Sequence, residues 1–217
     1  MKIKNKTVYF FVLSVFLIAS DQFSKIIMRN HFGVVDAGID YSRTVYDSIS
    51  VLGKFLQFTY TENEGMAMGI TFGAGKIFLS IFSVLASIAL SYYLYKLNSF
   101  SNWLKLGVAL ILAGAVGNLI DRVFYGLIYH YDKLFYGRVI DFIKVEYFPF
   151  IFNIADSCVS VGVAFLILFH KKIPTFKELM NRQPDDNIQV PEQSISNDVT
   201  RPVSVSPVSD DNINIRY

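Results

Sequence analysis

Four apolar stretches of this chain approach the roughly 20 residues that a helix needs to cross the hydrocarbon core of a bilayer. They lie at about 8–28, 77–95, 103–121 and 150–169. The 217-residue chain is 53% hydrophobic and 18% charged, which is too apolar for a single soluble domain of this size. We therefore predict an all-α membrane protein with four transmembrane helices in a domain over 1–173.

The distribution of lysines predicts how these helices are oriented, because cytoplasmic flanks of membrane spans are enriched in Lys and Arg. Both termini and the connection over 96–105 should be cytoplasmic, while 29–75 and 122–149 should lie on the outer side. We expect the first apolar run not to be cleaved as a secretory signal, since it continues past Asp21. The lysines that support this orientation are Lys2, Lys4, Lys6, Lys96, Lys105, Lys171, Lys172 and Lys177.

The first outer segment contains a pattern that is typical of β-strands. Apolar and other residues alternate with a period of two over 54–61 and again over 66–72, which is typical of strands. The residues between them, 62–65, are turn-forming, so we predict a small outer-face β-hairpin with Asn63 near its tip. Residues 36–50 fit no period and are expected to be loop.

The C-terminal segment, 174–217, collects Pro, Ser, Asn and Asp and has few large apolar residues. A segment of this composition cannot bury enough apolar surface to fold alone. We predict that it is a disordered cytoplasmic tail.

Two aspartates, Asp141 and Asp156, lie near the start of the last apolar stretch. An ionisable side chain in a membrane segment is costly and faces protein or water, so it indicates a functional site. Two carboxyl groups within a few ångström cannot both ionise, and such a pair can hold an acid and a base at once. Asn153, Ser157 and Ser160 share a helical face with Asp156, and this polar stripe fits a catalytic site or an ion path.

Asp21 and Lys25 are spaced to pair on one face of the first helix. They form either a self-neutralising pair at a helix end or part of a site that holds substrate. In the third stretch, small residues predict close packing between helices. These residues are Ala113, Gly114 and Gly117.

Asn118, Asp121 and Arg122 also share one helical face. The planar guanidinium of Arg122 suits a carboxylate, a phosphate or a substrate carbonyl. We expect Asp121 to be the structural partner of Arg122. The residues alone leave both Asp121 and Asp141 open as the partner of Asp156.

Composition argues against several other kinds of site. The formal net charge is +2, and no basic stripe indicates nucleic-acid binding. The single cysteine, Cys158, excludes an intramolecular disulfide and a multi-cysteine metal site. Because Cys158 lies in an apolar run, we expect it to be a small core residue.

The order of these segments is more specific than any one of them. Over about 8–171 the chain resembles the lipoprotein signal peptidase family (signal peptidase II), which are four-span bacterial aspartyl proteases. The motifs that carry the resemblance are Asp-Gln-Phe-Ser-Lys at 21–25, Asn-Glu-Gly-Met-Ala-Met-Gly at 63–69, Gly-Asn-Leu-Ile-Asp-Arg at 117–122, Val-Ile-Asp-Phe at 139–142 and Phe-Asn-Ile-Ala-Asp-Ser at 152–157.

The resemblance implies a catalytic dyad of Asp141 and Asp156, without a metal or organic cofactor. It implies an enzyme of the bacterial inner membrane that cuts prolipoproteins before a diacylglyceryl-modified cysteine, near the outer face. Its partners would be lipid-modified precursors and membrane lipids, and we expect a monomer. The residues implied to bind substrate or support the site are Asp21, Lys25, Asn63, Gly65, Asn118, Asp121, Arg122 and Asn153.

The chain departs from the family pattern in several places. Met68 stands where the family usually has an aromatic residue, and the stretch 123–140 is longer than usual. The position of Asp141 therefore depends on how this longer stretch loops out.

Two alternative functions stay open. One is a small proton-coupled carrier in which the aspartates form a relay, and the other is a prepilin-type or presenilin-type aspartyl protease. A carrier predicts polar groups through the middle of several spans, whereas 77–95 offers only serines and tyrosines and the acids cluster at span ends. The acids in question are Asp21, Asp121, Asp141 and Asp156.

Overall fold

A computed structural model describes residues 6–32, 48–64 and 73–181 of the chain. The fold is mostly helical, with a four-stranded antiparallel sheet. The helices are α1 (Thr7–His31), α3 (Gly73–Lys96), α4 (Asn102–Ile128), α5 (Ile154–Leu168), the 3-10 turn η1 (His170–Lys172) and α6 (Phe176–Asn181), and the strands are β1 (Ile49–Leu52), β2 (Leu56–Asn63), β3 (Val139–Val145) and β4 (Ile151–Phe152).

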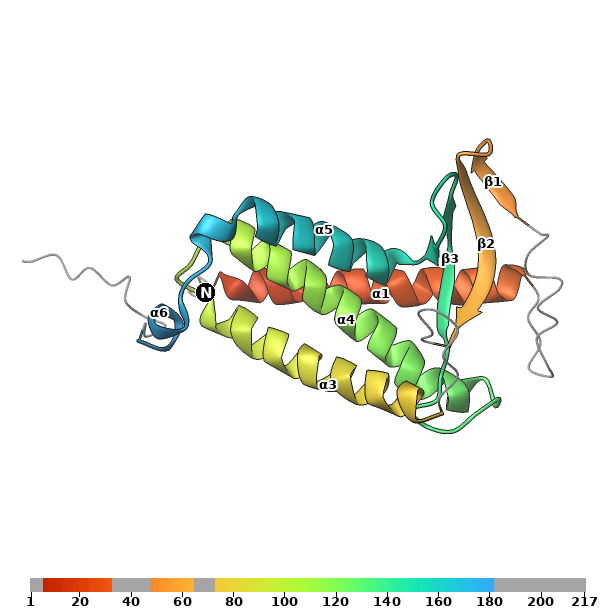
Figure 1. Cartoon of the computed structure of the whole chain (residues 1–217), viewed down its shortest axis with the longest axis horizontal. Coiled ribbons are helices and arrows are strands. Elements are labelled where there is room, and N and C mark those ends of the chain that lie inside the picture. The colour runs from red at the N-terminus through yellow and green to blue at the C-terminus, as the bar shows by residue number, and fades with distance from the viewer. Residues whose placement is uncertain (1–5, 33–47, 65–72, 182–217) are drawn as a thin grey trace, which may run out of the picture. The chain divides into compact units, whose positions relative to one another are not determined.

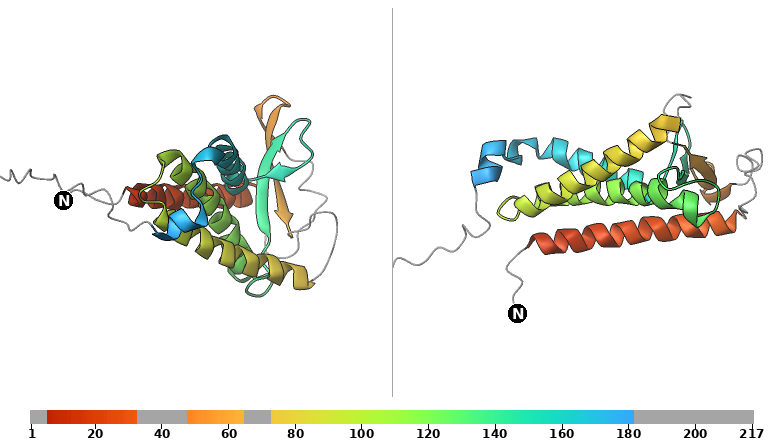
Figure 2. Two further views of the ribbon diagram at one scale, coloured as in Figure 1. Left: turned by 60° about the vertical axis from the view of Figure 1, so that its left-hand side comes forward. Right: turned by 90° about the horizontal axis from the view of Figure 1, so that it is seen from below.

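Helix α4 is the centre of the bundle, because it packs against α1, α3 and α5 (Figures 1 and 2). Its small residues allow this close approach, as predicted. A Cβ atom on Gly114 would collide with the backbone oxygen of Ala155 on α5, and one on Gly162 of α5 would lie 2.7 Å from the backbone oxygen of Gly107 on α4. The two backbones are therefore in direct contact.

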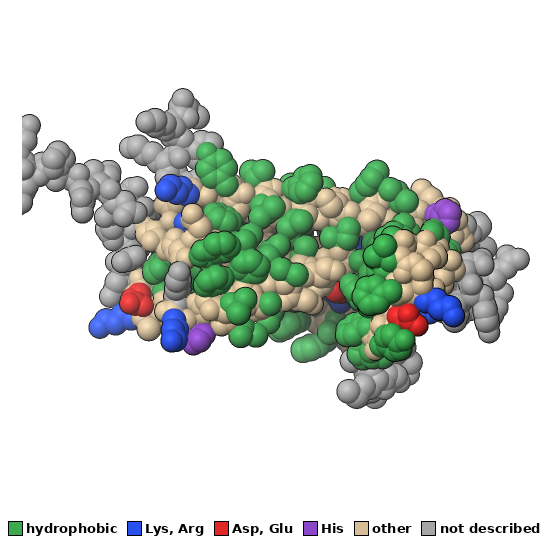
Figure 3. Space-filling view, turned by 90° about the horizontal axis from the view of Figure 1, so that it is seen from above, with side chains coloured by type: hydrophobic (Ala, Val, Ile, Leu, Met, Phe, Trp, Pro, Cys, Tyr) green, Lys and Arg blue, Asp and Glu red, His purple; other side chains and the backbone are tan. Residues whose placement is uncertain are grey.

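Three helices in the described part of the chain are long and apolar enough to cross a membrane. They are α1, α3 and α4, which confirms the first three predicted stretches, although four transmembrane helices are not confirmed. The fourth predicted span, 150–169, begins with strand β4 and contains α5, a 15-residue apolar helix. Hydrophobic side chains cover the flank of the bundle, and charged side chains gather at its two ends (Figure 3).

The sheet has the strand order β1-β2-β3-β4 and lies across the bundle end where α1 and α4 finish and α5 starts (Figure 1). Strand β2 pairs with β3 so that Thr61 lies opposite Asp141 and Asn63 opposite Val139. The register shifts between Phe58 and Thr61. Through this pairing, Asn63 and Asp141 reach the same part of the sheet.

The predicted hairpin is wrong in its turn and in its loop boundary. Glu62 and Asn63 end strand β2 and form no turn, because β2 is held by β3 and the Glu62 side chain is buried in ion pairs. Ile49 and Ser50, assigned to the 36–50 loop, belong to β1. The second predicted strand, 66–72, lies outside the described residues.

The long stretch 123–140 folds back onto α4. Its first residues continue α4 to Ile128, beyond the predicted span end. The chain then reverses, and the backbone N–H of Gly137 donates to the Arg122 carbonyl at 2.9 Å while that of Phe135 donates to the Val123 carbonyl at 3.1 Å. The extra residues thus lie in the end of α4 and in the reversal that follows it, before β3 begins at Val139.

The predicted disordered tail includes a short ordered helix. Helix α6 lies at the end of the bundle opposite the sheet (Figure 1). Leu179 is buried in an apolar cluster with Leu94, Leu97 and Leu104 from the ends of α3 and α4. This contact explains why the helix forms despite the polar composition around it. Residues 182–217 lie outside the described residues.

Candidate active site

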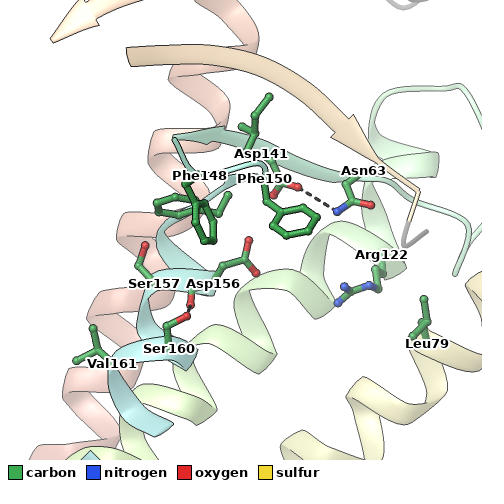
Figure 4. A pocket seen from close by; sticks show the side chains of 12 residues that line it. Asn63, Leu79, Arg122, Asp141, Phe148, Phe150, Asp156, Ser157, Ser160 and Val161 are labelled. Carbon is green, nitrogen blue, oxygen red and sulfur yellow. Dashed lines mark hydrogen bonds between the residues drawn. The ribbon is translucent and has the colours of Figure 1, made fainter. Parts of the chain in front are cut away.

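A pocket of about 690 Å³ lies between the sheet and the helices (Figure 4). It receives polar side chains from β2, α4, β3 and α5, and apolar ones from α3 and the turn between β3 and β4. Both members of the expected dyad face it. The principal lining residues are Asn63, Arg122, Asp141, Phe150, Asp156 and Ser157.

Asp156 is placed by the first turn of α5. The Asn153 side chain accepts a hydrogen bond from the Asp156 backbone N–H at 2.8 Å, and the Asp156 carboxylate accepts one from the Asn153 backbone N–H at 3.3 Å. This reciprocal capping box satisfies backbone donors that have no partner within the helix. Ser157 and Ser160 follow on the same side and line the pocket, so the predicted polar stripe faces inward.

Asp141 is placed by β3 and is almost fully buried. The Asn63 amide donates to one carboxyl oxygen of Asp141 at 3.1 Å, and the Asn153 amide donates to the other at 2.6 Å. Burial raises the pKa of Asp141 to about 7, and the negative charge of Asp156 acts in the same direction, while the two amides oppose the shift. Asp141 can therefore hold a proton close to neutral pH.

Two amides connect the aspartates. The Asn118 amide donates to Asp156 at 2.7 Å, and its oxygen lies 3.1 Å from the Asn153 amide nitrogen, which also contacts Asp141. The carboxyl groups thus belong to one hydrogen-bonded network, which fixes their relative placement.

A buried ion cluster lies next to this network. The Lys25 ammonium is 2.7 Å from a carboxyl oxygen of Asp21 and 2.7 Å from one of Asp121, and it donates to the Asn118 oxygen at 3.1 Å. All three charged side chains are at most 1% exposed. The predicted pairing of Asp21 with Lys25 is confirmed, although it lies well inside α1 and not at a helix end.

The ion cluster also holds the backbone beside each aspartate of the pocket. Asp21 accepts a hydrogen bond from the backbone N–H of Ala155, the residue before Asp156, at 2.8 Å. Asp121 accepts one from the backbone N–H of Ile140, the residue before Asp141, at 3.2 Å. One buried lysine therefore connects the helix start that carries Asp156 with the strand that carries Asp141.

The expected pairing of Asp121 with Arg122 is wrong. Neighbouring residues on a helix point in different directions, so Asp121 faces Lys25 while Arg122 lines the pocket. The Arg122 guanidinium points toward Asp156 in Figure 4. Its Nε is buried and has no hydrogen-bond partner among the described residues. The guanidinium as a whole lines the pocket and carries further N–H donors besides this buried Nε.

Sequence reasoning missed a second ion cluster, beneath the strand that carries Asn63. Glu62 is buried and lies 2.9 Å from Arg29 of α1 and 3.4 Å from Arg138, and it accepts a hydrogen bond from the Tyr60 hydroxyl at 2.7 Å. Two signals were available. Arg29 lies one helical turn after Lys25, and Tyr60 and Glu62 share the strand face opposite Asn63.

Gln22 lies in the motif Asp-Gln-Phe-Ser-Lys at 21–25, but no role was predicted for it from the sequence. Its amide donates to Asp121 at 2.9 Å and to the Gly117 carbonyl at 3.0 Å, and it accepts a hydrogen bond from the Tyr125 hydroxyl at 2.9 Å. Gln22 therefore locks α1 to α4 beside the Lys25 cluster. The available signal was a polar side chain next to Asp21 in a helix long and apolar enough to span a membrane.

Gly65 and Cys158 are the other residues singled out in the sequence. Gly65 lies outside the described residues. Cys158 is a buried free cysteine, as expected. Among residues 6–32, 48–64 and 73–181, no group of three or more His, Cys, Asp or Glu side chains is arranged to hold a metal ion.

The chain is similar to one protein family, to several relatives and to solved structures. The family described as "Signal peptidase (SPase) II" matches residues 13–171. A lipoprotein signal peptidase from Chlorobaculum tepidum is 37% identical over 143 residues, which are 64% of this chain and 85% of that protein. One from Pelodictyon phaeoclathratiforme is 32% identical over 166 residues, covering 76% and 90%. A bacterial membrane enzyme structure solved in meso at 1.9 Å superposes with a TM-score of 0.59 and 30% identity, covering 80% of this chain and 99% of that one.

The ion cluster predicts a stability effect for Asp121→Asn. This substitution removes one anion from a fully buried cluster and leaves the Lys25 charge less compensated, which costs roughly 3–5 kcal/mol. We expect a clearly lower melting temperature in detergent. The matched control is Asp132→Asn, because Asp132 is exposed at the same end of the bundle. Equal melting temperatures for the two variants would show that the cluster does not hold the fold.

Proposed function

The chain belongs to the signal peptidase II family, and on this premise we propose that it is an aspartic endopeptidase that removes the signal peptide from lipid-modified prolipoproteins. Membership of the family makes the chain a peptidase. The observation that carries the aspartic mechanism is that Asp141 and Asp156 line one pocket and are connected through Asn118 and Asn153.

In the proposed reaction the two aspartates have different protonation states. Asp141 holds a proton, consistent with its raised pKa, and donates a hydrogen bond to the oxygen of the scissile carbonyl. Asp156 is ionised and takes a proton from water as the water oxygen attacks the carbonyl carbon. When the C–N bond breaks, the leaving amine receives a proton from the dyad, and a carboxylic acid and a free amine result.

Arg122 and Asn63 are proposed to bind the peptide around the dyad. The Arg122 guanidinium lines the pocket and carries a rigid set of N–H donors, so substrate carbonyl oxygens can accept from it. Asn63 donates to Asp141 from the end of β2, and thereby orients the acid. Asp21, Lys25, Asp121 and Asn153 act behind these groups by holding the backbone.

The pocket wall suits a lipidated substrate. Apolar side chains line the pocket beside the polar residues (Figure 4), and the pocket adjoins the exposed apolar flank of α5. The relatives are named lipoprotein signal peptidases, and a diacylglyceryl-modified cysteine would keep its acyl chains in the bilayer while its peptide bond reaches the dyad. The apolar lining residues are Leu79, Phe148, Phe150, Ile151, Phe152 and Val161.

We also propose how the chain lies in the membrane. Residues 1–173 form the peptidase domain in the bacterial inner membrane, α5 serves as the fourth span, and both termini are cytoplasmic. The sheet and the pocket then lie near the outer face. This orientation is supported by Lys96, Lys105 and Lys171 at the bundle end away from the sheet.

The carrier alternative has no comparable support. Its relay needs acids distributed along the bundle, but Asp21 and Asp121 are neutralised by Lys25 beside the pocket. Helix α3 contains no acidic residue.

Replacing either dyad aspartate tests the mechanism. Asp141→Asn and Asp156→Asn should each lower single-turnover cleavage of a lipidated precursor peptide by several orders of magnitude, because asparagine keeps the shape but cannot exchange a proton. Their melting temperatures should stay close to that of the wild type, since removal of one carboxylate relieves repulsion. Asp132→Asn is the matched control and should cleave normally. Turnover by Asp141→Asn together with a folded but inactive Asp121→Asn would make Asp121 the partner of Asp156.

The pKa of Asp141 predicts the alkaline limit of activity. Cleavage requires the protonated acid, so the rate should fall about tenfold per pH unit above pH 7. The Asn63 amide favours the ionised form, and Asn63→Ala should therefore raise the pKa and move the fall to higher pH, although the maximal rate decreases. The measurement is the pH dependence of kcat for both proteins in one buffer series. An alkaline limit that does not move would contradict the assignment of Asp141 as the acid.

Cysteine labelling tests the orientation. Lys133→Cys and Lys171→Cys introduce exposed thiols at the two ends of the bundle. Both are made with Cys158→Ala, which removes the only native thiol. An impermeant maleimide added to intact spheroplasts should label position 133 and spare position 171 until the membrane is opened. The reverse pattern would place the pocket on the cytoplasmic side.

A further inference from the structure

The strand ends at one end of the sheet expose a group of apolar side chains. The turn between β1 and β2 and the turn between β3 and β4 lie side by side there, since the Glu146 backbone N–H donates to the Phe55 carbonyl at 2.9 Å. We call these two turns the aromatic tip. Its exposed apolar residues are Val51, Leu52, Phe55, Tyr147, Phe148 and Phe150.

Tyr147 is the most exposed apolar side chain of the aromatic tip, and its backbone conformation does not favour tyrosine. Its side chain is 94% exposed, and no hydrogen bond or ring contact involves it within the described part of the chain. Its φ is 67°, a left-handed conformation that glycine or asparagine adopts far more readily than tyrosine. Within residues 6–32, 48–64 and 73–181 no packing contact therefore accounts for an aromatic side chain at this position. A contact with the surroundings of the protein would account for it.

The charges around the aromatic tip indicate what it contacts. Lys54 and Lys144 are both exposed beside it, whereas Glu146, the one acid of the two turns, is partly buried. Aromatic rings next to lysines are the combination found at the headgroup level of a bilayer, where the ring is half-immersed and the ammonium meets phosphate. A water-facing surface would instead leave a contiguous apolar patch exposed at a cost.

The aromatic tip is also continuous with a surface that faces lipid. Phe148 and Phe150 line the same pocket as Val161 of α5, and α5 continues away from the sheet with exposed Val163 and Ile167. The strands run across the helix axes, and the end of the sheet that carries the aromatic tip projects past α5 (Figure 1). From above, green side chains cover the flank of the bundle and appear again at the sheet end (Figure 3).

We propose that the aromatic tip inserts into the interface of the outer leaflet and binds the lipid surface there. Tyr147 and its neighbours occupy the headgroup and upper acyl region, and Lys54 and Lys144 contact lipid phosphates. The pocket thereby opens at the level where the glycerol part of a membrane lipid lies. This inference rests on the helices spanning the membrane and does not depend on the peptidase activity.

A spin label measures the depth of the aromatic tip directly. Tyr147→Cys with Cys158→Ala provides one exposed thiol, and Asp132→Cys in the same background is the matched control on the 129–138 connection. The labelled full-length proteins are reconstituted in nanodiscs of phosphatidylethanolamine and phosphatidylglycerol. Collision rates with oxygen, which concentrates in lipid, and with a nickel chelate, which stays in water, are then compared.

We expect oxygen to dominate at position 147 and the nickel chelate at position 132. Equal water accessibility at both positions would overturn the proposal. Protection of position 147 from both reagents would also overturn it, because it would indicate contact with protein, such as a second copy of the chain. Because the measurement needs no cleavage, its result is separate from the outcome of the dyad variants.

A second variant excludes a role of Tyr147 inside the fold. Tyr147→Gly removes the ring and suits the left-handed backbone, so the melting temperature in detergent should be unchanged or higher. In nanodiscs, the labelled neighbour Leu52→Cys should shift toward the aqueous reagent when Tyr147→Gly is added, and Tyr147→Trp should restore its depth. A lower melting temperature, or an unchanged depth at position 52, would show that the ring does not anchor the tip.

Discussion

The buried ammonium of Lys25 is the interaction on which the rest of the site depends. A lysine removed from water is costly unless its charge is matched, and here Asp21 and Asp121 match it at 2.7 Å each. Each carboxylate also uses its remaining capacity to accept a backbone N–H, from Ala155 and Ile140 respectively. The distance between the start of α5 and strand β3 is thus set by electrostatics and not only by apolar packing, which alone fixes a membrane helix loosely along its axis.

Around this cluster the molecule separates structural charges from reactive ones. The structural ions are compensated within the protein, as the contacts of Lys25 and of Glu62 show. The pocket instead combines two nearby carboxyl groups with an arginine whose Nε has no hydrogen-bond partner in the described part of the chain. Burial, and after it the negative charge of Asp156, raises the pKa of Asp141 and gives the site a proton to donate. Helix α4 supplies a member of each set, Asp121 to the structural ions and Arg122 to the pocket, because adjacent helical positions face different neighbours.

The apolar stretches made three helices predictable, because length and hydropathy alone determine which segments can span a bilayer. Strand β3 was not visible as a strand, since residues 139–142 are all buried and show no alternation. The partner of Asp121 depends on how far α4 is rotated relative to α1, which no local pattern encodes, so its assignment to Arg122 was wrong. By contrast, Asp156 and Asn153 could be placed together, because a capping box is a local feature of a helix start.

Asn153 has a consequence for which sequences this fold can accept. Its oxygen caps α5, and its amide nitrogen donates to Asp141. Aspartate, serine or threonine would satisfy the helix, but none of them supplies the amide donor, and aspartate would add a third negative charge. Glutamine carries the donor on a longer side chain that does not form the same cap. Two unrelated demands therefore confine this position to one residue type. A substitution that alters the cap of α5 also alters the hydrogen bond to Asp141.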